Sequence, residues 1–296
     1  MTTRERLAAA FELDRHPLRF AASETTIAGD AAVETLRFET ASGEPVRGRL
    51  TRPARPVGRR PAILYIHAHG RRYDIGAAEL TEGRAALQGP LGPVFAAMGY
   101  VSLCIDLPCF GERADETESA AAKALLWRGR SLAGRMLGEL ASALGWLAAR
   151  PDVDPARIGA FGISMGATFG YWLAAVDSRI ACLVHQCCYA DFAAMIDTGA
   201  HDRHGIYLTV PGLLDIASNG VIAGLIAPRP QLACIGDLDG LTPPPAVDIA
   251  LQETRAAYAA AGAANAFTLC REPEFGHQES PGMREETLAF FREHLG

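Results

Sequence analysis

The stretch Gly162-Ile163-Ser164-Met165-Gly166 places a serine between two glycines, where an apolar run from Arg157 to Ile163 gives way to a helical pattern from Met165 to about Val176. A turn sharp enough to expose the serine hydroxyl leaves no room for side chains two positions before and two positions after it, which explains both glycines. The pattern is typical of a nucleophile elbow. Short patterns of this kind also arise by chance, so the rest of the chain has to supply the context.

An acid and a histidine follow the serine in the order that a serine, acid and histidine triad of this kind requires. Asp239 comes shortly after the buried run Gln231 to Ile235, and His277 lies shortly after the run Ala266 to Cys270. Both runs have the pattern of short buried strands. The order predicts Ser164 as the nucleophile, His277 as its general base, and Asp239 as the group that orients the imidazole.

Other residues could fill two of these roles. Asp237 is the alternative acid, because a strand ending two residues earlier would bring it to the loop instead of Asp239. His201 and His204 are alternative bases, although both precede the acid in the sequence, which the order of such triads disfavours.

Two backbone amides are expected to stabilise the charge that develops on the substrate's carbonyl oxygen. The N–H of Met165, directly after the serine and at a helix start, is one. The other is expected from the loop His67-Ala68-His69-Gly70-Arg71, which follows the strand pattern Ala62 to Ile66, and we assign it to His69 with Arg71 as the alternative. Because no third histidine or carboxylate is close in sequence to this loop, we predict neither a metal nor a cofactor.

Short apolar runs alternate with helical patterns after residue 61, which predicts a mostly parallel central sheet with helices on both faces. Alternating residues at 33–40 and 46–52 predict an N-terminal antiparallel hairpin, joined to the sheet by a proline-rich connection over 53–61. We expect a single domain over 1–296. Ligands of such sheets bind beyond the carboxyl ends of the strands, where the proposed catalytic residues fall.

Two segments are expected to decorate this domain. Residues 1–32 are read as an N-terminal helical arm, which could cap the domain or pack on a second subunit, so a homodimer is an open alternative. Residues 189–230 are longer than a connection needs and are read as a lid or cap insertion. The candidate substrate-binding residues are Arg71, Trp127, His185, His204 and Tyr207.

Composition limits the partners. With 49% hydrophobic residues, 21% charged residues and a formal net charge of −6, the chain can bury a large core but offers no overall basic character for nucleic acid or an anionic membrane. A small, neutral or modestly polar substrate fits better. The first residues carry no apolar secretion core, and no run approaches about 18 apolar residues. We therefore expect a soluble, cytoplasmic protein.

From about Val33 to Leu295 the chain resembles the α/β hydrolases of the dienelactone hydrolase and acetyl xylan esterase type. The resemblance rests on the elbow and on five further motifs: His67-Ala68-His69-Gly70, Asp106-Leu107-Pro108-Cys109-Phe110-Gly111-Glu112-Arg113, Pro151-Asp152-Val153-Asp154-Pro155-x-Arg157-Ile158-Gly159, Ala227-Pro228-Arg229-Pro230 and Pro243-Pro244. It implies a serine esterase with the α/β-hydrolase fold and with Ser164, Asp239 and His277 as its triad. Dienelactone hydrolases themselves use a cysteine nucleophile, so lactone cleavage is not implied.

These observations favour a serine hydrolase that cleaves a carboxylic ester of a small molecule through an acyl-enzyme. One alternative keeps the triad and changes the bond to a lactone, an amide or a carbon–carbon bond. Another is a catalytically silent protein that binds a small molecule, because a fold does not by itself imply a function.

Overall fold

The computed structural model describes residues 1–55 and 57–296; Pro56, in the expected proline-rich connection, lies outside the described residues. Within these residues the strands form one nine-stranded sheet in the order β1-β2-β3-β5-β4-β6-β7-β8-β9. The strands are β1 (Leu18–Ala28), β2 (Ala31–Thr40), β3 (Pro45–Pro53), β4 (Arg60–Ile66), β5 (Val101–Ile105), β6 (Val153–Ile163), β7 (Cys182–Gln186), β8 (Gln231–Gly236) and β9 (Phe267–Glu272). The last six are parallel to one another, and β1 to β3 are antiparallel. The fold confirms the predicted mostly parallel sheet.

The antiparallel edge is larger than the predicted hairpin. The hairpin itself, β2 and β3, is confirmed, but β1 is added outside it and pairs with β2 along its length. The prediction of a helical arm over 1–32 is wrong at this point, because α1 covers only Thr3–Ala10. Ten of the eleven residues of β1 are exposed, so the strand lacks the alternation of buried and exposed side chains that reveals a strand in a sequence.

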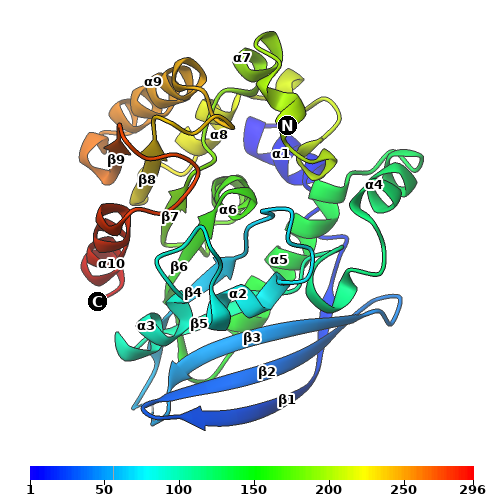
Figure 1. Cartoon of the computed structure of the whole chain (residues 1–296), viewed down its shortest axis with the longest axis vertical. Helices are drawn as coiled ribbons and strands as arrows, with labels where there is room; N and C mark the ends of the chain where they lie inside the picture. The colour runs from blue at the N-terminus through cyan, green and yellow to red at the C-terminus, as the bar shows by residue number, and fades with distance from the viewer. Residues whose placement is uncertain (56) are drawn as a thin grey trace.

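Helices cover both faces of the parallel part of the sheet (Figure 1). One hydrophobic cluster joins α1, α5, α6, α8 and α9 to one face, and a second joins α2, α3 and α10 to the other. The helices are α1, α2 (Glu79–Glu82), α3 (Leu91–Ala97), α4 (Glu118–Leu126), α5 (Leu132–Ala148), α6 (Met165–Val176), α7 (Phe192–Asp197), α8 (Asn219–Gly224), α9 (Pro244–Ala260) and α10 (Pro281–Leu295). In the described part of the chain, no helix is long and apolar enough to cross a membrane.

The strand register brings the ends of five strands to one edge of the sheet. Ile66 pairs with Gly162, Ile163 with Gln186, and Gly236 with Glu272, so β4, β6, β7, β8 and β9 end close to the same level. In Figure 1 the lid segment with α7 stands at one end of the molecule and the antiparallel strands form the opposite end. Residues that follow these strand ends are therefore gathered below the lid, as parallel sheets require of their ligand sites.

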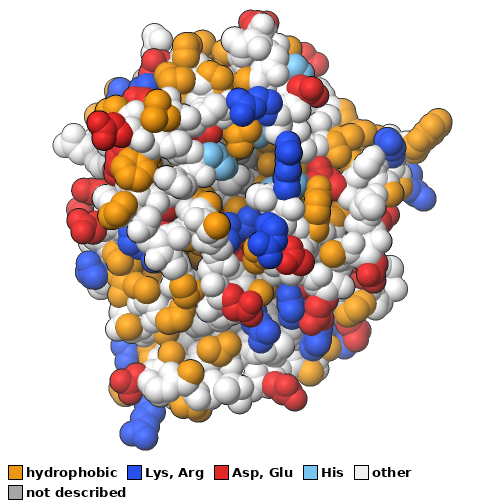
Figure 2. Space-filling model, viewed as in Figure 1, with side chains coloured by type: hydrophobic (Ala, Val, Ile, Leu, Met, Phe, Trp, Pro, Cys, Tyr) orange, Lys and Arg blue, Asp and Glu red, His pale blue; other side chains and the backbone are white. Residues whose placement is uncertain are grey.

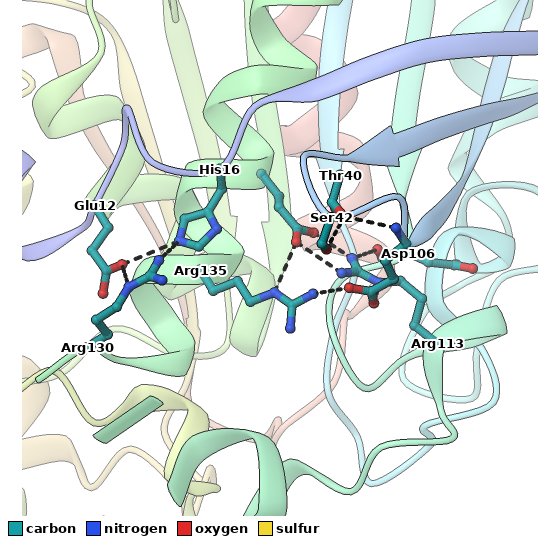
Figure 3. A network of polar contacts seen from close by, with 10 residues as sticks. Glu12, His16, Thr40, Ser42, Asp106, Arg113, Arg130 and Arg135 are labelled. Atoms are coloured by element: carbon teal, nitrogen blue, oxygen red, sulfur yellow. Dashed lines mark hydrogen bonds and ion pairs between the residues drawn. The ribbon is translucent and has the colours of Figure 1, made fainter. Parts of the chain in front are cut away.

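A buried polar network fixes the long connection between β5 and α5. The guanidinium of Arg113 donates to the carboxylate of Glu139 on α5, to Glu44 and to the carbonyl of Asp106. Figure 3 shows Arg113 and Arg135 in this network, with Arg130 bonded to Glu12 and His16 nearby. Buried ion pairs of this kind are costly to break, because the remaining charge is left without a partner. The network holds in place the connection that carries α4 and, with it, Glu118.

Candidate active site

Ser164 occupies a strained turn between β6 and α6. Its φ of 59° and ψ of −121° are rare for a residue other than glycine, and such strain persists only where the surroundings enforce it. A Cβ on Gly162 would collide with the backbone of Gly166, and one on Gly166 would collide with the carbonyl of Ile66. The two glycines thus allow the close approach of helix and strands that presents the serine hydroxyl.

The structure brings together the three residues of the predicted triad. The Nε2 atom of His277 lies 2.8 Å from the Oγ of Ser164, and its Nδ1 lies 2.7 Å from an Oδ of Asp239. A neutral imidazole has one donor and one acceptor nitrogen, and the carboxylate can only accept. Nδ1 therefore carries the hydrogen that is donated to Asp239, and Nε2 is free to accept the hydrogen of the serine hydroxyl.

Asp239, not Asp237, is the acid beside the histidine. Burial opposes ionisation of Asp239, but hydrogen bonds from His277, from the Leu241 N–H at 2.8 Å and from the Thr242 hydroxyl at 2.9 Å outweigh burial and lower the pKa of the carboxyl. The carboxylate of Asp237 forms an ion pair with Arg271 at 2.6 Å instead. The alternative acid is thus engaged elsewhere.

The two predicted backbone donors lie on opposite sides of the serine in the chain. The N–H of Met165 is the first of α6, and the N–H of His69 belongs to the loop after β4. Neither N–H has an acceptor within the described residues. Unpaired N–H groups at a helix start and in a loop beside a nucleophile are suited to bind an oxyanion.

A buried carboxylate fixes the loop that carries His69 from beneath. Glu79 accepts the N–H of Ala68 at 3.1 Å and the hydroxyl of Tyr65 at 2.8 Å, and it forms an ion pair with Arg84. Arg84 in turn donates to the carbonyl of Ala68 at 2.9 Å. His67 is fully buried, and this burial lowers the pKa of its imidazole to about 3, so the ring is neutral.

Glu118, the first residue of α4, holds the same loop from the other side. Its carboxylate accepts from Nε2 of His69 at 2.6 Å, from the hydroxyl of Tyr73 at 3.0 Å and from the backbone N–H of Tyr207 at 3.2 Å. One carboxylate therefore joins the loop after β4 to the lid. The sequence analysis does not single out Glu118; the only signal is the unusual length of the connection from 106 to 130.

Both ring nitrogens of His69 are engaged. Nε2 donates to Glu118, and Nδ1 accepts the backbone N–H of Arg71 at 3.0 Å. In this arrangement Nε2 is the donor nitrogen of the ring and Nδ1 is the acceptor. The ring also stacks on Tyr207 at 4.8 Å between centroids. The side chain of His69 thus shapes the loop and has no free nitrogen for a substrate.

A cavity of about 630 Å³ opens over the serine and the histidine, and it is the hollow in which histidine side chains are visible in Figure 2. The residues that line it come from the loop after β4, the elbow, the lid and the loops after β8 and β9: His69, Gly70, Arg71, Tyr73, Ser164, Asp202, Arg203, His204, Gly205, Tyr207, Leu241 and His277. Three of the five predicted substrate-binding residues, Arg71, His204 and Tyr207, belong to this lining.

Residues 192–215 of the predicted lid segment line a second, partly open cavity of about 620 Å³, mainly with apolar side chains. It shares Asp202, His204 and Gly205 with the first cavity. His204 bonds through Nε2 to the carbonyl of Leu241 at 2.9 Å, and burial lowers the pKa of its imidazole. The predicted lid segment therefore forms one wall of the cavity over Ser164.

Two predicted substrate-binding residues lie elsewhere. Trp127 follows α4 with 90% of its surface exposed and does not line the cavity. His185 is buried on β7, where its Nε2 pairs with Gln231 and burial lowers its pKa to about 3. His185 sits within the strand and not after its end, so it faces the core. Within residues 1–55 and 57–296, no group of three or more potential metal ligands occurs.

No protein-family model matches the chain. A protein of Bacillus subtilis (strain 168) named "Putative hydrolase YtaP" is 37% identical over 283 residues, which cover 95% of this chain and 94% of that one.

Solved structures of esterases share the fold. A "putative acetyl xylan esterase" from Bacteroides fragilis superposes with a TM-score of 0.76 at 16% identity, covering 98% of this chain and 86% of that one. An acetyl xylan esterase from Paenibacillus sp. R4 gives a TM-score of 0.69 at 17% identity, covering 99% and 93%. With this fold, and with 37% identity to the Bacillus protein over nearly its whole length, the chain belongs to the α/β-hydrolase family that includes that hydrolase.

Proposed function

We propose that the protein is a serine hydrolase that cleaves a carboxylic ester of a small molecule through an acyl-enzyme intermediate. The observation that carries the proposal is the hydrogen-bonded chain from Ser164 through His277 to Asp239, at the floor of a cavity large enough for a small molecule. The structural neighbours named as acetyl xylan esterases support an ester as the bond that is cleaved.

In the first half of the reaction, the Oγ of Ser164 attacks the ester carbonyl while Nε2 of His277 accepts the hydroxyl proton. The imidazolium that forms is stabilised by the carboxylate of Asp239, whose lowered pKa keeps it ionised at neutral pH. The tetrahedral intermediate then collapses, His277 returns the proton to the leaving alcohol, and the acyl group remains on Ser164.

The amides of Met165 and His69 stabilise the oxyanion of this intermediate. Their N–H groups have no protein acceptor in the described residues, so no internal bond has to be broken when the oxyanion forms. The bonds from Glu79 and Glu118 fix the loop of His69 before the substrate arrives. Such preorganised donors contribute about a hundredfold to a thousandfold each to turnover.

In the second half, a water molecule replaces the alcohol. His277 removes a proton from this water, and the resulting tetrahedral intermediate uses the same two amides. On collapse the bond from the acyl carbon to Oγ breaks, His277 returns the proton to Oγ, and the carboxylic acid leaves with Ser164 restored. The same residues would serve a lactone or an amide, so the choice among these bonds depends on the cavity and not on the triad.

A hydrolysis screen tests the proposal. The substrates are 4-nitrophenyl esters of increasing acyl length, acetylated sugars, lactones and amides, each with the wild-type protein and with Ser164→Ala. We expect at least one ester to be turned over, and Ser164→Ala to lower that turnover about a million-fold, as when the nucleophile of a triad is removed. If only amides or only lactones are cleaved, that bond is the one the enzyme hydrolyses, and the ester assignment is wrong. Equal rates for wild type and Ser164→Ala would reject the mechanism.

A further inference from the structure

The charge of the cavity over Ser164 is opposite in sign to that of the whole chain. The formal net charge of the protein is −6, yet the charged side chains lining the cavity are Arg71, Arg203 and Asp202. In the described residues, neither arginine lies within ion-pair distance of a carboxylate: the ion pairs found there include neither of them. On the face seen in Figure 2, blue basic side chains lie beside the pale blue histidines, and red acidic side chains lie a little farther away.

Arg71 is held at this place by the backbone. Its φ of 55° lies in the left-handed region, which residues other than glycine, asparagine and aspartate rarely adopt. The hydrogen bond from its N–H to Nδ1 of His69 keeps this turn closed. The backbone of Arg71 is therefore fixed two residues after the proposed oxyanion donor, and its exposed side chain belongs to the cavity lining.

Arg72, the next residue, provides the contrast. Its guanidinium forms two hydrogen bonds to the carboxylate of Asp74, at 2.9 and 2.7 Å, and it is absent from the cavity lining. The two consecutive arginines of this turn therefore differ in their partners. Arg72 is paired with a carboxylate, whereas Arg71 lines the cavity over Ser164 and has no acidic partner in the described residues.

Arg203 reaches the cavity from the lid. One of its guanidinium nitrogens donates to the carbonyl of Gly240, directly after Asp239. A guanidinium has five N–H groups, so donors remain beyond this one bond. The loop after β4 and the lid each contribute one cationic group to the space that also contains Ser164 and His277.

We propose that the substrate carries a carboxylate in addition to its ester, and that Arg71, with Arg203, binds this carboxylate. The inference rests on the proposed function and names the substrate class of the same site. Guanidinium groups bind carboxylates through paired, charge-assisted hydrogen bonds. The proposed substrate is therefore anionic, whereas the composition of the chain alone favoured a neutral or modestly polar one.

Matched ester pairs test this. One pair carries the charge on the acyl side, 4-nitrophenyl hydrogen adipate against 4-nitrophenyl hexanoate. The other carries it on the alcohol side, 4-acetoxybenzoate against its methyl ester. We expect kcat/KM of wild type to favour the anionic member of at least one pair by about ten- to a hundredfold, an advantage that decreases as salt screens it.

Four variants assign the effect. Arg71→Met should reduce the anionic-to-neutral ratio of kcat/KM by about tenfold or more, chiefly through KM, and Arg71→Lys should retain part of it. Arg203→Met should reduce the ratio less, because its guanidinium is already bonded to Gly240. Arg72→Met, the matched control from the same turn, should leave the ratio unchanged.

A second readout needs no substrate turnover. Free adipate and 4-hydroxybenzoate should slow the labelling of wild-type Ser164 by a fluorophosphonate more than their uncharged amides do, and Arg71→Met should abolish this difference. Two results would overturn the carboxylate site but leave the proposed function intact. One is Ser164-dependent cleavage of the neutral esters with no preference for the anionic esters; the other is an equal effect of Arg71→Met and Arg72→Met on the anionic-to-neutral ratio. Absence of any dependence on Ser164 would instead overturn the proposed function.

Discussion

At the scale of single residues, the environment of each carboxylate decides its role. Asp237 and Asp239 are two positions apart, yet only Asp239 is buried and bonded to His277, whereas Asp237 is paired with Arg271. The sequence could order these candidates but could not show which one meets the imidazole, because a shift of two residues at the end of β8 would exchange them.

We expect Asp239→Asn to lower kcat about ten-thousandfold, because an amide at this position favours the wrong tautomer of His277. Asp237→Asn removes an ion pair that is partly exposed and should change kcat by less than about threefold. Steady-state kinetics on one ester, with thermal unfolding to confirm that both variants fold, makes the comparison. Similar losses in the two variants would contradict the assignment of the acid.

Glu118 allows a second prediction at this scale. Glu118→Gln removes an acceptor shared by His69, Tyr73 and Tyr207, so the loop of the oxyanion donor and the lid lose their common bond. We expect kcat to fall about tenfold with little change in KM, since a fixed loop matters most in the transition state. A rise in KM with kcat unchanged would assign Glu118 to substrate binding instead.

The stability of the same variant should depend on pH. Burial opposes ionisation of Glu118, but hydrogen bonds from His69, Tyr207 and Tyr73 outweigh it and hold the pKa of the carboxyl below its usual 4.5. A lowered folded-state pKa contributes stability that is present above the unfolded pKa and is lost as pH falls through the folded one. Glu118→Gln should thus be less stable than wild type at pH 7, and the difference should shrink below about pH 4.5 in denaturant unfolding. A difference that grows on acidification would contradict this.

At the scale of elements, the elbow is the joint between β6 and α6, and its geometry depends on backbones that nearly touch. The bounds of α6 agree with the helix predicted from the sequence, Met165 to about Val176. Buried apolar elements were predictable in this way: β8, Gln231–Gly236, extends the predicted run Gln231 to Ile235 by one residue. The exposed strand β1 was not, since solvent on its faces leaves no periodic pattern to read.

Gly166→Ala tests this joint. An added Cβ would meet the carbonyl of Ile66, which cannot move without shifting β4, so we expect a loss of about 2–4 kcal/mol in the free energy of unfolding. Gly170→Ala, one turn later in α6, meets only the end of the Leu183 side chain and should change stability by no more than about 1 kcal/mol. Urea unfolding of both variants checks this, and equal stabilities would mean that the elbow is not tightly packed.

At the scale of the whole molecule, the sheet gathers residues that are far apart in the sequence. The order of serine, acid and histidine after β6, β8 and β9 predicted three residues that the structure brings together, because parallel strands end at one edge. The contacts of Glu118 could not be predicted, since they depend on how the connection after β5 packs against the lid. His185 and Trp127 were misplaced for the same reason: residue type suggested a pocket, but only packing shows that one faces the core and the other the solvent.

The central claim is that Ser164 becomes covalently acylated because His277 activates it. Intact-protein mass spectrometry after reaction with a fluorophosphonate, followed by peptide mapping, measures this directly. We expect one adduct per chain, located on Ser164, absent from Ser164→Ala and formed far more slowly by His277→Ala. An unmodified wild-type protein, or an adduct on another residue that persists in Ser164→Ala, would contradict the account.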